Sequence, residues 1–283
     1  MKYQKITFNK IDMIEADNEN GLKIIVSPIG AALRSVVFND EEMLVTPKQN
    51  SDFFEPTSVL GKTSGPILKS PKSRLLNINN KDYTYDEKYH MGSFIFKSNP
   101  YMDKKIFSIL YSFKKKKMKD GLPGNIDYYV GYSMGPSDSV LLVDYRAVAS
   151  EETPVSISNN IMFSLAAKHF NELYLTVPSS LVLNENEYVQ APRELDFQKK
   201  KNCVSGEFDH TYKIKNSELP IVLESQKYRL EITLYDYDCV HINSDNGLNR
   251  GIAISPIDDP LGDNLASKKT IYHRQVLYKF IKK

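Results

Sequence analysis

Histidine and cysteine side chains are the groups of this chain best suited to proton transfer, thiol chemistry and metal binding. The five histidines are His90, His169, His210, His241 and His273. None of them falls at the spacing of metal ligands, and the chain has no HExxH, GxSxG or phosphate-loop motif. The two cysteines, Cys203 and Cys239, are too few for a disulfide framework and also lack metal-site spacing. The sequence therefore predicts no metal site.

One polar stretch is rejected as a phosphate loop, and a second is a candidate anion site. GKTSGP, from Gly61 to Pro66, is only superficially like a phosphate loop, because the preceding glycine of that pattern is absent. KKKKMKDGLPGN, from Lys114 to Asn125, is either a solvated loop ending in Asp-Gly and Pro-Gly turns or an anion site for a sugar phosphate. Because runs of charge usually form solvated faces, the sequence favours the loop.

Two adjacent asparagines begin a mostly apolar run in the middle of the chain. The stretch SISNNIMFSLA, from Ser156 to Ala166, carries Asn159 and Asn160 between two segments with strand character. Asparagine is disfavoured inside strands because its amide competes for backbone hydrogen bonds. The pair therefore indicates either a turn or a side chain that points at something polar.

A period of two residues dominates the sequence and predicts β-strands. LLVDYRAVA, RLEITLYDYD and IDYYVGYSM each place apolar side chains on one face, and 18 tyrosines and 13 phenylalanines suit sheets. GLKIIVSPIGAALRSVVFND, ELYLTVPSSLVL, RGIAISP and RQVLYKFI also read as strands. No helical stripe exceeds about three turns, and no change in composition suggests a linker. We therefore expect an all-β protein with one large antiparallel β-sandwich domain over residues 1–283.

The composition is that of an ordinary soluble globular protein. The 283 residues are 41% hydrophobic and 25% charged, and a chain of this length can bury a large core. A net charge of +2 gives no reason to expect a nucleic acid or a membrane as partner. MKYQKITFNKIDMIEAD lacks the apolar core of a signal peptide, and no run is long enough to span a bilayer. We expect a cytoplasmic protein.

An ordered series of motifs resembles the aldose 1-epimerase (galactose mutarotase) family over nearly the whole chain. The series is GAALRSVVFNDEEMLVTP, SPKSRLLNINNKDYTYDEKYHMGSF, DGLPGNIDYYVGYSM, TPVSISNNIMFSL, LDFQ, FDHTYKI, GIAISPIDDPLGDN and YHRQVLYKFI. The resemblance implies the galactose mutarotase-like supersandwich, a large β-sandwich, which agrees with the period of two.

The resemblance also implies a reaction on a small carbohydrate that needs no cofactor. The family opens the hemiacetal of a pyranose and lets it close in either configuration at C1. A base removes the proton of the C1 hydroxyl and an acid protonates the ring oxygen, so two titratable groups lie on opposite sides of the ring. Other polar side chains hold the sugar hydroxyls and fix the orientation of the sugar.

Three binding residues carry over from the family's motifs. Arg74 in KSRLL matches the sugar-binding arginine, His90 in YHMGS matches the first histidine of the site, and Asp209 in FDHTY matches the carboxylate that binds sugar hydroxyls. Taken without the resemblance, Arg74 is equally a surface residue or an ion-pair partner, His90 a structural histidine, and Asp209 a strand end or turn cap. The resemblance implies that all three bind substrate.

The acid and the base of the family do not carry over. Asn160 stands at the position of the acid histidine, and Ser255 stands at the position of the base glutamate. An amide is no proton donor of tunable pKa, and serine has no basicity near neutral pH unless something activates it. Taken without the resemblance, Asn160 and Ser255 are polar core residues that hydrogen-bond to the backbone. Asp258 and Asp259 follow Ser255 by three and four residues. Either replaces the base only if the proton acceptor of a rigid site moves that far along the chain. Asn160 is expected to face the sugar cavity.

The sequence leaves three functions open. The first is an aldose 1-epimerase, or a hexose-6-phosphate mutarotase relative, with a relocated acid and base. The second is a carbohydrate-binding protein that has lost the chemistry, and the third is a β-sandwich interaction module with a vestigial pocket. Since an acid–base group is typically worth a factor of ~10²–10⁴ in rate, the loss of both favours weak or absent mutarotation. The sequence does not indicate the sugar or the oligomeric state.

Overall fold

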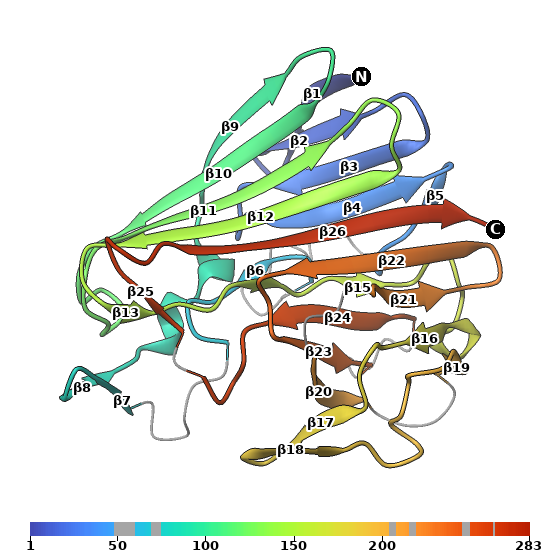
Figure 1. Cartoon of the computed structure of the whole chain (residues 1–283). Coiled ribbons are helices and arrows are strands. Elements are labelled where there is room, and N and C mark those ends of the chain that lie inside the picture. Colours follow the sequence, from blue (N-terminus) through green and yellow to red (C-terminus); the bar gives the residue numbers. More distant parts are fainter. Residues whose placement is uncertain (48–59, 69–74, 204–207, 215–218, 245–249, 263) are drawn as a thin grey trace.

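Antiparallel strands form nearly all of the regular structure in the computed structural model of the chain (Figure 1). The structure describes residues 1–47, 60–68, 75–203, 208–214, 219–244, 250–262 and 264–283. Within these residues the helical elements are short 3-10 turns, namely η2 (Glu87–Tyr89), η3 (Met91–Ser93) and η4 (Phe170–Glu172). The prediction of a large antiparallel all-β fold is confirmed. The described residues contain no helix with the length and apolar character needed to cross a bilayer.

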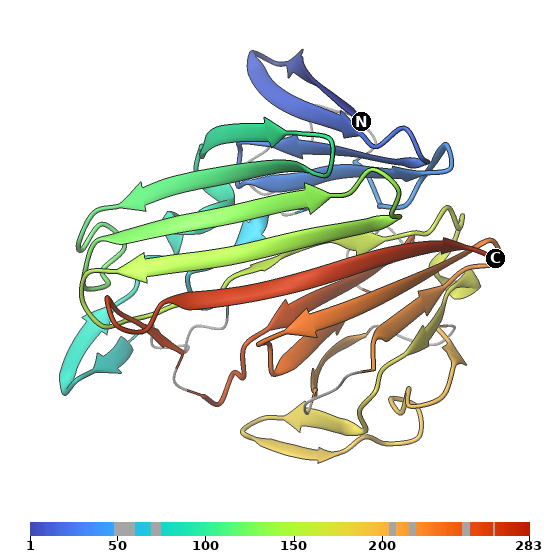
Figure 2. The same cartoon turned by 45° about the horizontal axis from the view of Figure 1, so that its top comes forward.

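The largest layer is a nine-stranded sheet. Its strands, in spatial order, are β19 (Lys201–Asn202), β16 (Tyr174–Thr176), β21 (Ile221–Glu224), β22 (Tyr228–Tyr235), β26 (Tyr272–Lys282), β12 (Val140–Ala149), β11 (Ile126–Met134), β10 (Phe107–Lys115) and β9 (Lys97–Met102). Figure 2 shows β26, in red, between β12 in green and β22 in orange. The last strand of the chain therefore lies in the interior of this sheet.

Two further sheets carry the remaining long strands. The five-stranded sheet runs in the order β1 (Lys2–Phe8), β2 (Ile11–Asp17), β3 (Leu22–Ser27), β4 (Ala32–Phe38) and β5 (Glu41–Glu42). The six-stranded sheet runs in the order β15 (Met162–Phe163), β24 (Ile252–Ile257), β23 (Cys239–Asn243), β20 (Asp209–Lys213), β17 (Leu181–Asn184) and β18 (Glu187–Gln190). A β-bridge between Leu44 and Phe163 connects the end of the first sheet to the start of the second.

Three pairs of short strands complete the fold. They are β6 (Thr63–Ser64) with β14 (Ser158–Asn159), β7 (Leu75–Ile78) with β8 (Lys81–Thr84), and β13 (Thr153–Pro154) with β25 (Leu265–Ala266). The pairing of β6 with β14 matters most for function, because it fixes the backbone around the two asparagines.

One hydrophobic core joins all three sheets. It includes Ile24 of β3, Tyr128 of β11 and Ile242 of β23, which are at most 1% exposed. In β11 and β12 buried and partly exposed residues alternate, because successive side chains of a strand point to opposite faces. The apolar faces predicted from the period of two are thus the faces that pack into the core.

The lysine run differs from its prediction as a solvated loop. Lys114 and Lys115 belong to β10, and Lys115 is only 4% exposed. Its ammonium group contacts Asp120 at 2.8 Å, and Asp120 also accepts a hydrogen bond from the backbone of Leu122. Lys116 remains exposed. The prediction is wrong for Lys115 because the turn that follows β10 brings a buried carboxylate back onto the strand.

Candidate functional site

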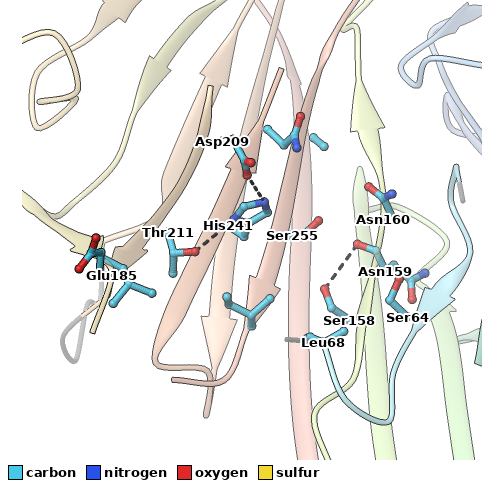
Figure 3. Close-up of a pocket in the computed structure, with 14 residues that line it drawn as sticks. Ser64, Leu68, Ser158, Asn159, Asn160, Glu185, Asp209, Thr211, His241 and Ser255 are labelled. Atoms are coloured by element: carbon cyan, nitrogen blue, oxygen red, sulfur yellow. Dashed lines mark hydrogen bonds and ion pairs between the residues drawn. The ribbon is translucent and has the colours of Figure 1, made fainter. Parts of the chain in front are cut away.

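A pocket of about 490 Å³ opens on one face of the six-stranded sheet (Figure 3). Strands β20, β23 and β24 supply one wall, with Asp209, His241 and Ser255 facing the cavity. The segment around β6 and β14 lies beside β24 and supplies the adjoining side of the pocket, with Ser64 and Asn160. Most of these side chains are polar and uncharged, so the pocket suits a ligand that is rich in hydroxyl groups.

Strand register brings the polar residues of the first wall together. In the antiparallel ladder His241 lies opposite Thr211 on one side and opposite Ser255 on the other. Asn243 lies opposite Asp209 in the same way. Since directly opposed residues share a face, these five side chains form one polar patch on the sheet. The strands that supply them are β20, β23 and β24.

His241 is hydrogen-bonded through both of its ring nitrogens. Its Nε2 lies 3.1 Å from Oδ1 of Asp209, and its Nδ1 lies 3.1 Å from Oγ1 of Thr211. The side chain of Asp209 is 72% exposed, and that of His241 is 32% exposed. The pair therefore has a fixed orientation and remains accessible from the cavity.

The two adjacent asparagines have different environments. Asn159 is buried, donates to the hydroxyl of Tyr132 at 2.6 Å and accepts from the hydroxyl of Thr63 at 3.1 Å. Asn160 lines the pocket, and its backbone amide donates to Lys62 while its carbonyl accepts from Gly61. The sequence offered a turn or a polar target, and the structure shows that both asparagines line the pocket, with Asn159 also hydrogen-bonded to Tyr132 and Thr63.

Asp258 and Asp259 do not line this pocket. Asp258 is buried and accepts hydrogen bonds from Tyr272 at 2.8 Å and from Arg274 at 2.7 Å. Asp259 forms an ion pair with Lys213. Both carboxylates are thus held by partners outside the pocket, and neither takes the place of the base next to Ser255.

His90 is also absent from the lining of the pocket. Burial, and then the nearby charge of Lys62, lower the pKa of His90, so its neutral form is favoured. Burial likewise lowers the pKa of Lys62, whose backbone carbonyl accepts a hydrogen bond from the backbone amide of Asn160. Arg74 lies outside the described residues. Of the residues predicted from the sequence, the structure therefore brings Asn160, Asp209 and Ser255 together.

Sequence reasoning did not select His241, Thr211 and Asn243. The segment DCVHINSD does contain a signal, because polar His241 and Asn243 alternate with buried Val240 and Ile242. That alternation predicts a strand with a polar face, but not which strands lie beside it. No group of three or more histidine, cysteine, aspartate or glutamate side chains suited to a metal ion occurs in the described part of the chain.

Known proteins share both this fold and parts of this sequence. The structure of galactose 1-epimerase from Lactobacillus acidophilus matches 99% of this chain, and 98% of its own, with a TM-score of 0.87 at 18% identity. A GalM/aldose epimerase homologue from C. elegans matches 95% of this chain, and 98% of its own, with a TM-score of 0.84 at 19% identity. These TM-scores establish the fold, which is the predicted galactose mutarotase-like sandwich.

Sequence comparison adds the family. Galactose mutarotase from Bos taurus is 28% identical over 119 residues, which are 35% of this chain and 34% of that protein, so the match spans about a third of the relative's length. The model of the aldose 1-epimerase family matches residues 12–262. Because that match covers most of the chain, the protein belongs to the aldose 1-epimerase family.

Proposed function

We propose that the protein binds a hexose or a related sugar in the pocket on the six-stranded sheet and interconverts its α and β anomers. The observation that carries the proposal is the convergence of Asn160, Asp209, His241 and Ser255 on one cavity of about 490 Å³. A pyranose presents hydroxyls around its whole rim, and polar groups from several strands around the pocket match that distribution. Family membership supplies the reaction class.

The pocket favours a neutral sugar over a sugar phosphate. A bound phosphate is normally held by arginine or lysine, and neither occurs among the described residues that line this pocket. The lysine run does not supply the missing charge, because Lys114, Lys115 and Lys117 form ion pairs with Asp127, Asp120 and Glu151. The described lining of the pocket therefore favours an unphosphorylated hexose as the ligand.

A second candidate function is sugar binding without catalysis. It is favoured by Asn160 and Ser255, which stand where family members carry an acid and a base. An amide and an unactivated hydroxyl bind sugar hydroxyls well but do not transfer protons near neutral pH. This candidate and the first share the same pocket and the same ligand, and they differ only in rate.

Ligand binding is tested by thermal shift against a panel of hexoses and their 6-phosphates. A sugar at one hundred times its dissociation constant adds about 2.7 kcal/mol to the free energy of unfolding. We expect a shift with at least one neutral hexose, and Asn160→Ala should abolish it while Lys116→Ser leaves it unchanged. Polarimetry on a freshly dissolved α-anomer then separates the two candidates. The absence of a shift with every sugar would overturn both.

A further inference from the structure

We propose that Asp209 and His241 act together as the acid–base pair of the reaction, both from one wall of the pocket. This inference rests on the proposed function, since it assigns the proton transfers of that same site. It differs from the arrangement implied by the family resemblance, in which an acid and a base act from opposite sides of the sugar. Here the β6 and β14 side of the pocket carries Asn160, Ser64 and Ser158, whose side chains do not titrate near neutral pH.

The first support is geometric. Asp209 and His241 come from adjacent strands, β20 and β23, and their polar ends meet at 3.1 Å on the pocket side of the sheet (Figure 3). With the carboxylate ionised, the proton between them belongs to Nε2 of His241, because a carboxylate only accepts. Thr211 holds the other nitrogen, Nδ1, and thereby fixes the plane of the ring.

The second support is the chemistry of the anomeric centre. The C1 hydroxyl and the ring oxygen are bonded to the same carbon, so one base and one acid that lie side by side can reach both. The Asp209 carboxylate removes the proton of the C1 hydroxyl, and the O–H electron pair forms the C1 carbonyl. The bond between C1 and the ring oxygen breaks, and its electron pair takes the proton from Nε2 of His241. The products are the open-chain aldehyde, protonated Asp209 and neutral His241.

Ring closure on the other face reverses these transfers. After rotation about the C1–C2 bond, His241 takes the proton of the attacking hydroxyl, and Asp209 returns its proton to the carbonyl oxygen. Both groups then regain their starting charges, so the cycle needs no cofactor and no exchange of protons with solvent. Asn160 and Ser255 keep a role in this scheme, since they hold the hydroxyls while C1 turns.

The third support is the elimination of other groups. Among the described residues that line the pocket, the titratable side chains are Glu185, Asp209 and His241. Glu185 lies in the turn after β17, set apart from the pair in Figure 3. The uncharged groups that face His241 from the neighbouring strands are Thr211 of β20 and Ser255 of β24. Asp209 and His241 are thus the described titratable groups of the pocket that contact each other.

A defined pH profile follows from this pairing. The pair is active with one carboxylate and one imidazolium, so the protein-dependent rate should be bell-shaped in pH and should fall where either group changes its charge. The two limits belong to the coupled pair and not to either residue alone.

The experiment compares three variants in the full chain by polarimetry, after subtraction of the protein-free rate. His241→Gln and Asp209→Asn should each lower the protein-dependent rate about 100-fold and remove the peak in the pH profile. The matched control is His273→Gln, because His273 forms the same kind of contact with Asp144, at 2.7 Å, on the nine-stranded sheet. The control should keep the native rate and the native profile.

The outcomes distinguish failure of the acid–base assignment from failure of the proposed sugar-binding function. If the native protein binds a hexose but does not accelerate mutarotation between pH 4 and pH 8, the acid–base assignment is overturned and the binding function stands. The same holds if His241→Gln keeps the native rate. If the native protein binds no sugar, the proposed function fails first. Should His241→Gln not fold, Asp209→Asn decides, because the Asp209 side chain is 72% exposed and its replacement leaves the core intact.

Discussion

Asn159 and Asn160 are chemically identical neighbours with separable contributions to stability and binding. Both line the pocket, but Asn159 is buried and hydrogen-bonded to Tyr132 and Thr63, whereas Asn160 is partly exposed. We predict that Asn159→Ala lowers the free energy of unfolding by about 1–3 kcal/mol, since the buried hydrogen bonds of its amide with Tyr132 and Thr63 are lost. Asn160→Ala should leave stability within about 0.5 kcal/mol and weaken sugar binding. Urea unfolding and thermal shift with ligand measure the two effects, and identical behaviour of the two variants would contradict the assignment.

Asp144 gives the protein a pH-dependent contribution to stability. Burial by itself would raise the pKa of Asp144, but hydrogen bonds from Arg146, His273 and Gln275 outweigh it and lower the pKa below its ordinary value. In that range the unfolded state binds more protons than the native state, so stability rises with pH. The contribution is complete above about pH 4 and is lost as the pH falls through the native pKa.

This balance predicts a difference between native protein and Asp144→Asn that depends on pH. At pH 7 the variant should be less stable by about 1–3 kcal/mol, because Arg146 and His273 lose a charged partner. At pH 3 the gap should narrow, since Asp144 is then increasingly protonated in the native protein as well. Urea unfolding at both pH values measures the gap. A gap of equal size at pH 3 would show that Asp144 acts through packing and not through its charge.

At the scale of elements, the turn after β10 depends on one buried ion pair. Burial lowers the pKa of Lys115, and the contact with Asp120 opposes that shift. We predict that Lys115→Ser lowers the free energy of unfolding by about 3–5 kcal/mol, because it leaves Asp120 as an unpaired buried charge. The exposed neighbour offers the control, and Lys116→Ser should change stability by less than about 0.5 kcal/mol. Equal midpoints for the two variants in urea would refute the importance of the pair.

The strands were predictable from the sequence to the extent that their signal is local. Alternation in LLVDYRAVA and IDYYVGYSM identifies both the strands and the buried faces, because one face of each sheet packs into the core. The position of Asn160 in the pocket follows from the family motifs. The contact of His241 with Asp209 does not, because β20 pairs with β23 although β21 and β22, which belong to another sheet, lie between them in the sequence. Burial of Lys115 was hidden for a local reason, since the run of charge does not reveal that the following turn brings Asp120 back onto the strand.

At the scale of the whole molecule, β26 holds the nine-stranded sheet together. It pairs with β12 along one side and with β22 along the other. We predict that a chain ending at Ile271 fails to fold cooperatively, because loss of β26 separates the sheet into two parts with exposed apolar faces. Urea unfolding followed by tyrosine fluorescence measures cooperativity. A chain that ends at Phe280 is the control, and it should keep a single transition because it retains most of both ladders.

The position of β26 also imposes an order on biosynthesis. A ribosome makes β12 and β22 long before the strand that separates them in the finished sheet, so both wait with unpaired backbone edges that can accept any other strand. Long-range pairing of this kind is slow, and nascent chains with open edges are prone to aggregate. Slower translation lengthens the time for which these strand edges stay unpaired. Synthesis of fewer chains at one time lowers the chance that unpaired edges of two nascent chains meet. Yield of folded protein should therefore respond to the number of ribosomes engaged on the message more than to the speed of each.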